Sequence, residues 1–250
     1  MRLDKALVVR GLCRSRGEAQ AALDGDAVTL DGQIVHKASL TIGEEAVLAV
    51  AETGPRWVSR GALKLEAALA HFDIAVVGRA ALDVGASTGG FTECLLRRGA
   101  ASVHAVDVGH GQMVSALAAD PRVCSREGVN ARLLTPADFP HPFEVLVADL
   151  SFISLTLVLP ALAPLLGEGG DMVCLVKPQF EVGQAKLGKG GIVRDVRARE
   201  EAVTRVVMAA GACGLAERGR MTSPLEGSEG NIEFLLWLKM EAGSGPAGGE

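Results

Sequence analysis

Apolar residues recur with two different spacings along the chain, and the first 50 residues have a pattern of their own. Apolar positions three or four residues apart predict short helices over 2–9 and 15–23, because an α-helix turns once in 3.6 residues. Three short apolar runs follow, at 27–30, 33–36 and 46–50. Asp31-Gly32 between the first two runs is a typical two-residue hairpin turn. This part of the chain therefore predicts a small α+β domain over residues 1–50.

From residue 57 to residue 240, short runs rich in Val, Leu and Ala alternate with helical patterns. Such alternation predicts parallel strands that are buried on both faces and joined by helices. The expected strands are 80–84, 102–106, 122–125, 144–148, 171–176, 216–221 and 232–239. The expected helices are about 59–72, 88–98, 112–119, 155–166 and 197–213. Because turn residues fill the gap between the last two strands, we expect a doubly wound, seven-stranded Rossmann-like α/β sheet whose last strand is antiparallel.

Two segments interrupt these patterns and set the expected domain limits. Residues 51–56 contain the helix- and strand-breaking pair Gly54-Pro55 and predict a linker. Residues 241–250 are rich in Gly and Ser and predict a disordered tail. The second domain is then expected over residues 57–240.

Composition and charge narrow the class of protein. The formal net charge is −5, so any surface for nucleic acid has to be a local cluster of cations. The five cysteines show no Cys-x-x-Cys spacing, which favours a reducing compartment and argues against a structural metal. The longest apolar stretch, 155–166, contains two prolines and is too short to span a bilayer, and the first residues lack the apolar core of a signal peptide. We therefore expect a cytoplasmic protein with no membrane and no metal.

Chemistry is concentrated in residues 80–92, which read Ala-Ala-Leu-Asp-Val-Gly-Ala-Ser-Thr-Gly-Gly-Phe-Thr. An apolar run ends in Asp83, a glycine-rich turn follows, and the next residues can begin a helix. Nucleotide-like ligands bind at this strand–turn–helix arrangement in doubly wound folds. Gly85 and Gly89 carry no Cβ and allow the backbone to approach a ligand closely.

Three kinds of site use such a turn. Dinucleotide binding requires Gly-x-Gly-x-x-Gly, but Ser87 stands at the middle position. Gly85-Ala86-Ser87-Thr88-Gly89 also matches the Gly-x-Ser-x-Gly of a hydrolase nucleophile. That chemistry needs a histidine late in the chain, whereas all five histidines lie at or before residue 141. These two interpretations are therefore disfavoured.

The third kind of site binds S-adenosylmethionine. This cofactor has an ammonium group and ribose hydroxyls, and each requires an acceptor. Asp83 ends one strand, and Asp107 ends the next about twenty residues after the glycines, as a ribose-binding acid does. Although both aspartates also suit ordinary turns, we favour the cofactor site.

Two later strand ends carry further charges. The predicted strands 144–148 and 171–176 are followed by Asp149 and Lys177. In an open α/β sheet, ligands bind beyond the carboxyl ends of the strands, so these side chains face the same crevice as Asp83. A lysine at a strand end is commonly a plain exit residue, but beside Asp149 it is a candidate base.

Basic residues also cluster at the start of the chain, where Arg2, Lys5, Arg14 and Arg16 are opposed by Asp4. A short charged run of this kind is often only a solvated face. However, the order helix, Ser-Arg, helix and Asp-Gly hairpin resembles the RNA-binding domain named after ribosomal protein S-four, the αL motif. That resemblance implies that these four cations contact RNA phosphates, which position a protein without reading sequence.

Lys64, Asp149, Lys177 and Glu233 match, in order and context, the Lys-Asp-Lys-Glu tetrad of FtsJ-type ribose 2′-O-methyltransferases. Over residues 1–240 the chain resembles the TlyA/haemolysin-A-like family. The motifs that carry this resemblance are Val58-Ser59-Arg60-Gly61, the glycine turn from Asp83 to Thr92, Asp149-Leu150-Ser151-Phe152, Lys177-Pro178-Gln179-Phe180-Glu181 and Gly188-Lys189-Gly190-Gly191-Ile192-Val193-Arg194-Asp195. Ala62 departs from the family, in which a second glycine is common.

The resemblance implies S-adenosylmethionine-dependent 2′-O-methylation of cytidine ribose in ribosomal RNA, with rRNA or ribosomal subunits as partner. The tetrad is the implied catalytic set, and Lys177 either removes the hydroxyl proton or only orients the hydroxyl. The expected cofactor contacts are Asp83, Gly85, Ser87, Thr88, Gly89, Asp107, Val108 and Asn130. The expected RNA contacts are Arg2, Lys5, Arg14, Arg16, Arg60, Lys186, Lys189 and Arg194.

Several alternatives remain open at this point. Asn130 equally suits a turn, and the glycine-rich segment 183–194 equally suits a plain linker. Trp57 either packs at the hinge or stacks on a base. The whole chain is alternatively an RNA-binding protein with an inactive methyltransferase fold, or a haemolysin-like membrane-active protein, although no amphipathic basic helix favours the latter.

Overall fold

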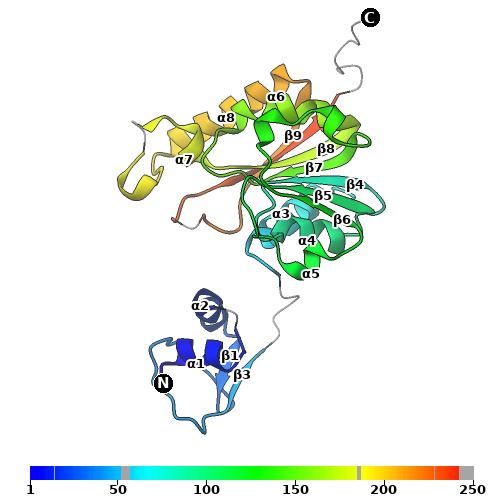
Figure 1. Cartoon of the computed structure of the whole chain (residues 1–250). Coiled ribbons are helices and arrows are strands. Elements are labelled where there is room, and N and C mark those ends of the chain that lie inside the picture. The colour runs from blue at the N-terminus through cyan, green and yellow to red at the C-terminus, as the bar shows by residue number, and fades with distance from the viewer. Residues whose placement is uncertain (14, 52–56, 185–186, 228, 242–250) are drawn as a thin grey trace, which may run out of the picture. The chain divides into compact units, whose positions relative to one another are not determined.

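The computed structural model describes residues 1–13, 15–51, 57–184, 187–227 and 229–241. The chain folds as two compact units, Met1–Arg56 and Trp57–Glu250 (Figure 1). Apart from Ala51 and Glu241, the expected linker and tail lie outside the described residues.

The N-terminal unit consists of two helices and a three-stranded sheet. Its elements are α1 (Leu3–Val9), α2 (Arg16–Asp24), β1 (Val28–Leu30), β2 (Gln33–Ile34) and β3 (Leu48–Val50), and the antiparallel sheet has the order β2-β1-β3. Asp31 and Gly32 both have positive φ angles, 51° and 82°, as the predicted Asp-Gly hairpin turn requires. Leu3, Leu7 and Leu23 are fully buried between the helices and the sheet.

The second unit contains a seven-stranded sheet of order β6-β5-β4-β7-β8-β10-β9, which confirms the predicted α/β class. Its strands are β4 (Ala80–Val84), β5 (Ser102–Val106), β6 (Val123–Arg126), β7 (Phe143–Ala148), β8 (Leu166–Val176), β9 (Leu215–Thr222) and β10 (Phe234–Met240). Strands β4 to β8 are parallel, whereas β10 is antiparallel to both β8 and β9. The beginning of β10 therefore lies at the edge where the parallel strands end.

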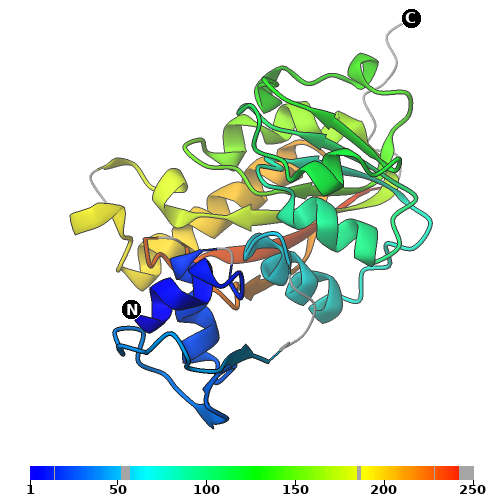
Figure 2. The same cartoon turned by 60° about the horizontal axis from the view of Figure 1, so that its bottom comes forward.

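Helices cover both faces of this sheet (Figures 1 and 2). The helices are α3 (Gly61–His71), α4 (Gly90–Arg97), α5 (Ser115–Ala118), α6 (Leu159–Leu162), α7 (Pro178–Glu181) and α8 (Val196–Ala212). Along β7, Val145 and Val147 belong to the core under α3 and α4, whereas Leu146 and Ala148 belong to the core under α6 and α8. Since successive side chains of a strand point to opposite faces, a continuous apolar run is what a doubly covered strand requires.

The prediction of one continuous helix over 155–166 is wrong. The segment is divided into η3 (Leu155–Leu157), α6 and η4 (Ala163–Leu165), and Leu166 already begins β8. Pro160 and Pro164 supply no backbone N–H, so a continuous helix loses its hydrogen bonds there. The other short 3₁₀ turns are η1 (Ala131–Leu133), η2 (Pro136–Asp138) and η6 (Lys189–Gly191). None of the helices in the described ranges is long and apolar enough to cross a membrane.

Candidate active site

Two lysine–carboxylate pairs lie at the edge of the sheet where the parallel strands end. Lys64 on α3 places its Nζ 2.5 Å from Oε2 of Glu233, which immediately precedes β10, and both side chains are buried. Lys177, directly after β8, places its Nζ 2.6 Å from Oδ1 of Asp149, directly after β7. The Nζ of Lys177 also donates a hydrogen bond of 2.9 Å to Oγ of Ser151. The structure thus brings the four residues of the predicted tetrad together as two ion pairs.

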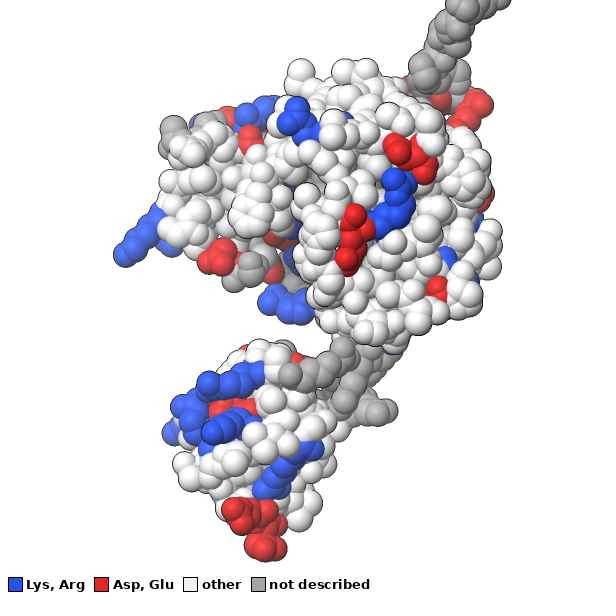
Figure 3. Space-filling view, viewed as in Figure 1, with Lys and Arg blue, Asp and Glu red and all other residues white. Residues whose placement is uncertain are grey.

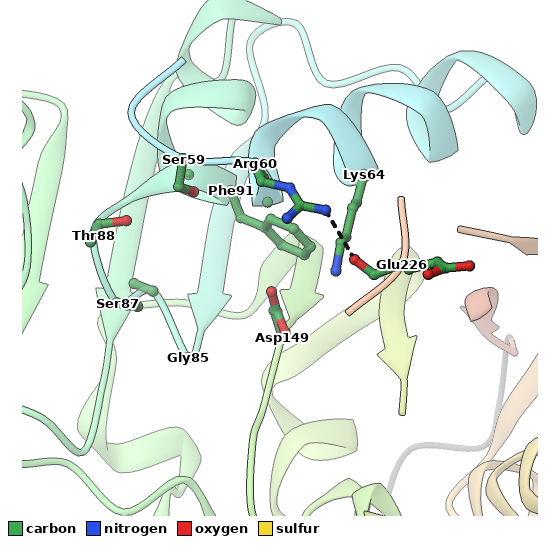
Figure 4. Close-up of a pocket in the computed structure, with 12 residues that line it drawn as sticks. Ser59, Arg60, Lys64, Gly85, Ser87, Thr88, Phe91, Asp149 and Glu226 are labelled. Atoms are coloured by element: carbon green, nitrogen blue, oxygen red, sulfur yellow. Dashed lines mark hydrogen bonds between the residues drawn. The ribbon is translucent and has the colours of Figure 1, made fainter. Parts of the chain in front are cut away.

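The four side chains border two cavities. The first, of about 250 Å³, is lined by Lys64 and Asp149 together with the glycine turn at Gly85. Figure 4 shows Lys64 and Asp149 extending toward the same space from α3 and from the end of β7. The second cavity, of about 1080 Å³, is lined by Lys64, Lys177 and Glu233. Lys64 therefore lines both cavities.

The glycine turn forms the floor of the first cavity. Gly85 has φ = 88°, and a Cβ at this position would collide with the backbone carbonyl of Asp149. Gly89 has φ = 98°, and a Cβ at this position would lie equally close to the side chain of Leu117. Only glycine accommodates both the left-handed backbone and the close approach. Ser87 and Thr88 complete the turn and line the same cavity.

Asp83 lies under this turn with one oxygen unpaired. Its side chain is fully buried, its Oδ2 accepts a hydrogen bond of 2.6 Å from Thr92, and its Oδ1 has no hydrogen-bond partner in the described part of the chain. Burial, together with the smaller contributions of the nearby charges of Asp149 and Asp107, raises the pKa of Asp83 to about 7. A buried carboxylate with a free oxygen is a ready acceptor for a cation that enters the cavity.

The remaining expected cofactor residues follow the next two strands. Asp107 accepts hydrogen bonds from the backbone N–H groups of Ser87 (2.8 Å) and Gly109 (2.7 Å), which ties the end of β5 to the glycine turn. Val108 is 71% exposed. Asn130 is exposed, and its Oδ1 caps η1 by accepting from the N–H of Arg132, so its role as a turn residue is present in the structure.

Ser151 and Phe152, which line the second cavity, had no assigned role in the sequence interpretation, nor had the buried Glu181 on α7. Phe152 is 92% exposed, has φ = 63°, and its ring centroid lies 5.2 Å from that of Phe180. A non-glycine residue with a left-handed backbone and an exposed aromatic ring is held there only at a cost, which makes it a candidate contact for a ligand.

Glu181 and Asn231 fix the loops around this cavity. Glu181 is buried, its Oε1 accepts from the N–H of Leu155 (2.8 Å), and its Oε2 accepts from the hydroxyl of Ser154; burial raises its pKa. This carboxylate ties the loop after β7 to α7. Asn231 is buried, and its side chain bonds the N–H of Val193 and the carbonyl of Gly191.

The expected RNA-contact residues lie in several places. Arg2 and Arg16 both bond the buried carboxylate of Asp4, at 3.1 and 2.6 Å, on the N-terminal unit, where Figure 3 shows basic side chains around acidic atoms. Lys5, Lys189 and Arg194 are exposed. Arg14 and Lys186 lie outside the described residues.

Arg60 and Trp57, just before α3, have different surroundings. Arg60 lines the first cavity and donates a hydrogen bond of 3.2 Å to the carbonyl of Glu226 (Figure 4). Trp57 packs against the core under α3 and α4, and the guanidinium of Arg97 lies 4.4 Å from its ring centroid. The packing interpretation of Trp57 therefore describes its position.

Comparison with known proteins agrees with this arrangement. Residues 57–240 match the family model described as FtsJ-like methyltransferase, and residues 1–48 match the S4 domain. The chain is 48% identical to the 16S/23S rRNA (cytidine-2′-O)-methyltransferase TlyA of Mycobacterium tuberculosis, over 96% of this chain and 90% of the relative. It is 40% identical to hemolysin A of Brachyspira hyodysenteriae, over 94% of this chain and 98% of the relative.

Solved structures give the same picture. A Streptococcus thermophilus protein, described as a candidate hemolysin, is 41% identical and superimposes with a TM-score of 0.76, covering 96% of this chain and 88% of that one. An S-adenosylmethionine-dependent methyltransferase from Mesorhizobium loti superimposes with a TM-score of 0.52 at 15% identity, over 69% of this chain and 96% of that one. The second likeness is one of fold alone.

Proposed function

The chain belongs to the FtsJ-like methyltransferase family, and we propose that it transfers a methyl group from S-adenosylmethionine to the 2′-hydroxyl of a cytidine ribose in ribosomal RNA, in the cytoplasm. The observation that carries this proposal is the pair of ion pairs, Lys64–Glu233 and Lys177–Asp149, at two cavities that share Lys64. One cavity then takes the cofactor and the other takes the target nucleotide.

The polar groups around the first cavity match those of S-adenosylmethionine. The unpaired oxygen of Asp83 matches the methionine ammonium, and Asp107 matches the ribose hydroxyls. Gly85 leaves room where a Cβ would fill it. Val108 and Asn130, after the second and third strands, are the proposed contacts of the adenine ring. Arg60 lines this cavity and is the proposed cation for the methionine carboxylate, in addition to its proposed contact with RNA.

When bound, the cofactor supplies an electrophilic methyl group on a sulfonium. The task of the protein is to hold a ribose hydroxyl in line with that methyl group, and correct orientation alone can correspond to effective molarities of about 10⁵ M or more. Lys177 is the proposed contact of the hydroxyl, which it orients or deprotonates. Asp149 holds the amine of Lys177, and Glu233 holds the amine of Lys64.

The second cavity fits a nucleotide turned out of an RNA strand. Its volume of about 1080 Å³ leaves room for a nucleoside and its flanking phosphates. Phe152 presents an exposed ring close to Lys177, and stacking of a base on an aromatic ring contributes about 1–3 kcal/mol. We propose that the target base stacks on Phe152 while its ribose faces Lys177.

The N-terminal unit and the segment 183–194 are the proposed RNA contacts. Arg2, Lys5, Arg14 and Arg16 on the first, and Lys186, Lys189 and Arg194 on the second, offer cations to phosphates. Such contacts orient the RNA and leave the choice of nucleotide to the cavity.

Lys177→Met tests the proposal. General acid–base groups contribute about 10²–10⁴-fold, so ribose methylation, measured by mass spectrometry of 16S and 23S rRNA after incubation with the variant, is expected to fall at least about 100-fold. Cofactor affinity, measured by calorimetry, is expected to stay within about twofold because Lys177 does not line the first cavity.

Lys239→Met is the matched control. Lys239 also pairs with an aspartate, Asp171, but at the far end of β10, so its substitution is expected to leave methylation intact. Unchanged methylation in Lys177→Met would remove Lys177 from the mechanism. No methylation by the unaltered protein on any rRNA or subunit would reject the function itself, and lysis of red cells by the purified protein without RNA would favour the membrane-active alternative.

A further inference from the structure

The amine of Lys177 has two partners that come from one loop. Asp149 lies 2.6 Å away as an ion pair, and Ser151 accepts a hydrogen bond at 2.9 Å. Although Asp149 Oδ1 lies this close, it forms no hydrogen bond with any described residue, so the angles of this contact lie outside those of a hydrogen bond. The ion pair therefore attracts the amine without directing it, and the directed contact is the one with Ser151.

The tetrahedral geometry of nitrogen gives this arrangement a consequence. Four positions surround Nζ of Lys177: the side chain occupies one, and Ser151 lies toward a second. The bond to Ser151 stops rotation about the last side-chain bond, and this sets the directions of the other positions. Lys177 and Ser151 both line the second cavity, so a substrate hydroxyl in that cavity meets the remaining position on that side, whether it carries a proton or a lone pair.

We infer that Ser151 is a positioning residue for the methyl transfer: its hydroxyl fixes the rotation of the Lys177 amine about the last side-chain bond, so that the remaining position faces the ribose hydroxyl. This inference rests on the proposed function and adds to it a residue outside the tetrad. Without Ser151, Asp149 still holds the amine nearby, but the amine turns freely about that bond.

The surrounding loop keeps Ser151 in place. Phe152, the next residue, has a left-handed backbone, and the buried carboxylate of Glu181 bonds the hydroxyl of Ser154 and the N–H of Leu155. Because these contacts fix both the bend and the far end of the loop, the fold itself holds the backbone of Ser151 beside Lys177.

The test compares Ser151→Ala with Ser151→Thr, which keeps a hydroxyl at the same position. In Ser151→Ala, kcat for rRNA methylation is expected to fall about tenfold, the loss of one directed hydrogen bond in the transition state. KM for rRNA and the cofactor dissociation constant are expected to stay within about twofold, and Ser151→Thr is expected to recover most of kcat. Ser102→Ala, at the opposite edge of the sheet, is the control, and the unfolding midpoint of each variant checks that it is folded.

A double-mutant cycle with Lys177→Met separates positioning from other roles. If Ser151 acts through Lys177, Ser151→Ala changes the residual rate of Lys177→Met less than about twofold. A further tenfold loss in that background, or an undiminished kcat in Ser151→Ala alone, would overturn the inference. In either case the effect of Lys177→Met would survive, so a failure of this inference differs from a failure of the proposed function, in which the unaltered protein methylates nothing.

Discussion

Two buried aspartates, one in each unit, have opposite electrostatic surroundings. Asp4 in the N-terminal unit is 5% exposed and receives the guanidinium groups of Arg2 and Arg16. These arginines hold the pKa of Asp4 well below its usual range. Asp83 in the methyltransferase unit is fully buried, its one side-chain hydrogen-bond partner among the described residues is Thr92, and burial raises its pKa to about 7.

The charge of Asp4 is balanced by two arginines of its own unit, whereas one oxygen of Asp83 has no partner among the described residues. Asp4 balances two cations of its own unit and holds them close together at the surface, where they are available to phosphates. None of the described residues places a cation on the free oxygen of Asp83, so the charge of this carboxylate is costly until a positive group binds. The same residue type is therefore an organiser of a surface in one unit and a proposed recognition group in the other.

The largest expected effect is on cofactor affinity when Asp83 loses its charge. A hydrogen bond to a charged group contributes about 1.5–3 kcal/mol, so Asp83→Asn is expected to weaken cofactor binding about 10- to 100-fold by calorimetry. The unfolding midpoint of the cofactor-free protein is expected not to fall, because the substitution removes a desolvated charge. Asp120→Asn, a partly exposed aspartate of the same unit that pairs with Arg122, is the control. Undiminished affinity in Asp83→Asn would remove Asp83 from the cofactor site.

Acid is expected to weaken cofactor binding through the same group. With a pKa of about 7 in the free protein, Asp83 is protonated at pH 6, and the ammonium of the cofactor requires the carboxylate. Binding then carries the cost of removing that proton, so affinity is expected to rise about tenfold between pH 6 and pH 8. Calorimetry across this range measures the slope. The slope is expected to flatten in Asp83→Asn, and an equal slope in that variant would assign it to another group.

A smaller effect, on rRNA affinity, is expected when Arg16, a partner of Asp4, is replaced. Arg16→Ala is expected to weaken rRNA binding about three- to fivefold at about 0.1 M salt and to reduce the salt slope by about one, as the loss of one phosphate contact does. Filter binding across a salt series measures both quantities. Arg122→Ala, an exposed arginine paired with Asp120 in the methyltransferase unit, is the control. An unchanged salt slope in Arg16→Ala would place its guanidinium away from phosphate.

The smallest expected effect is on the acid stability of the N-terminal unit. Since the arginines lower the pKa of Asp4, its stabilising contribution is present above about pH 4, the unfolded value, and is lost as the pH falls below it. Asp4→Asn is therefore expected to be less stable than the unaltered protein at pH 7, and this difference is expected to shrink toward pH 2. Urea unfolding followed by NMR signals of α1 measures it. A constant difference across this range would mean that Asp4 contributes by shape rather than by charge.

Sequence patterns predicted the central strands best. The bounds of β4 and β5 agree with the predicted 80–84 and 102–106, because short continuous apolar runs between turns have few other uses. The helix predicted over 155–166 is wrong because Pro160 and Pro164 divide its apolar run into short turns. Where helices and strands are short, side-chain pattern alone does not decide between 3₁₀ turns, helix and strand.

The candidate site divides in the same way. Motifs pointed to Lys64, Asp149, Lys177 and Glu233, which the structure brings together. The roles of Ser151 and Glu181 escaped notice because hydrogen bonds between distant loops leave no periodic signal in the sequence. The motif Asp-Leu-Ser-Phe did contain a signal, since it places a hydroxyl and an aromatic ring just after an aspartate at the carboxyl end of a parallel strand, where ligands bind.

The late position of β10 in the sequence makes the order of synthesis matter for the proposed activity. This strand lies between β8 and β9, and Glu233 enters the site only because β10 begins at the edge where its neighbours end. A growing chain that does not yet include β10 lacks both this strand and the carboxylate that pairs with Lys64. The N-terminal unit is translated first, so in the proposed function a growing polypeptide acquires its grip on RNA before it acquires the means to modify it.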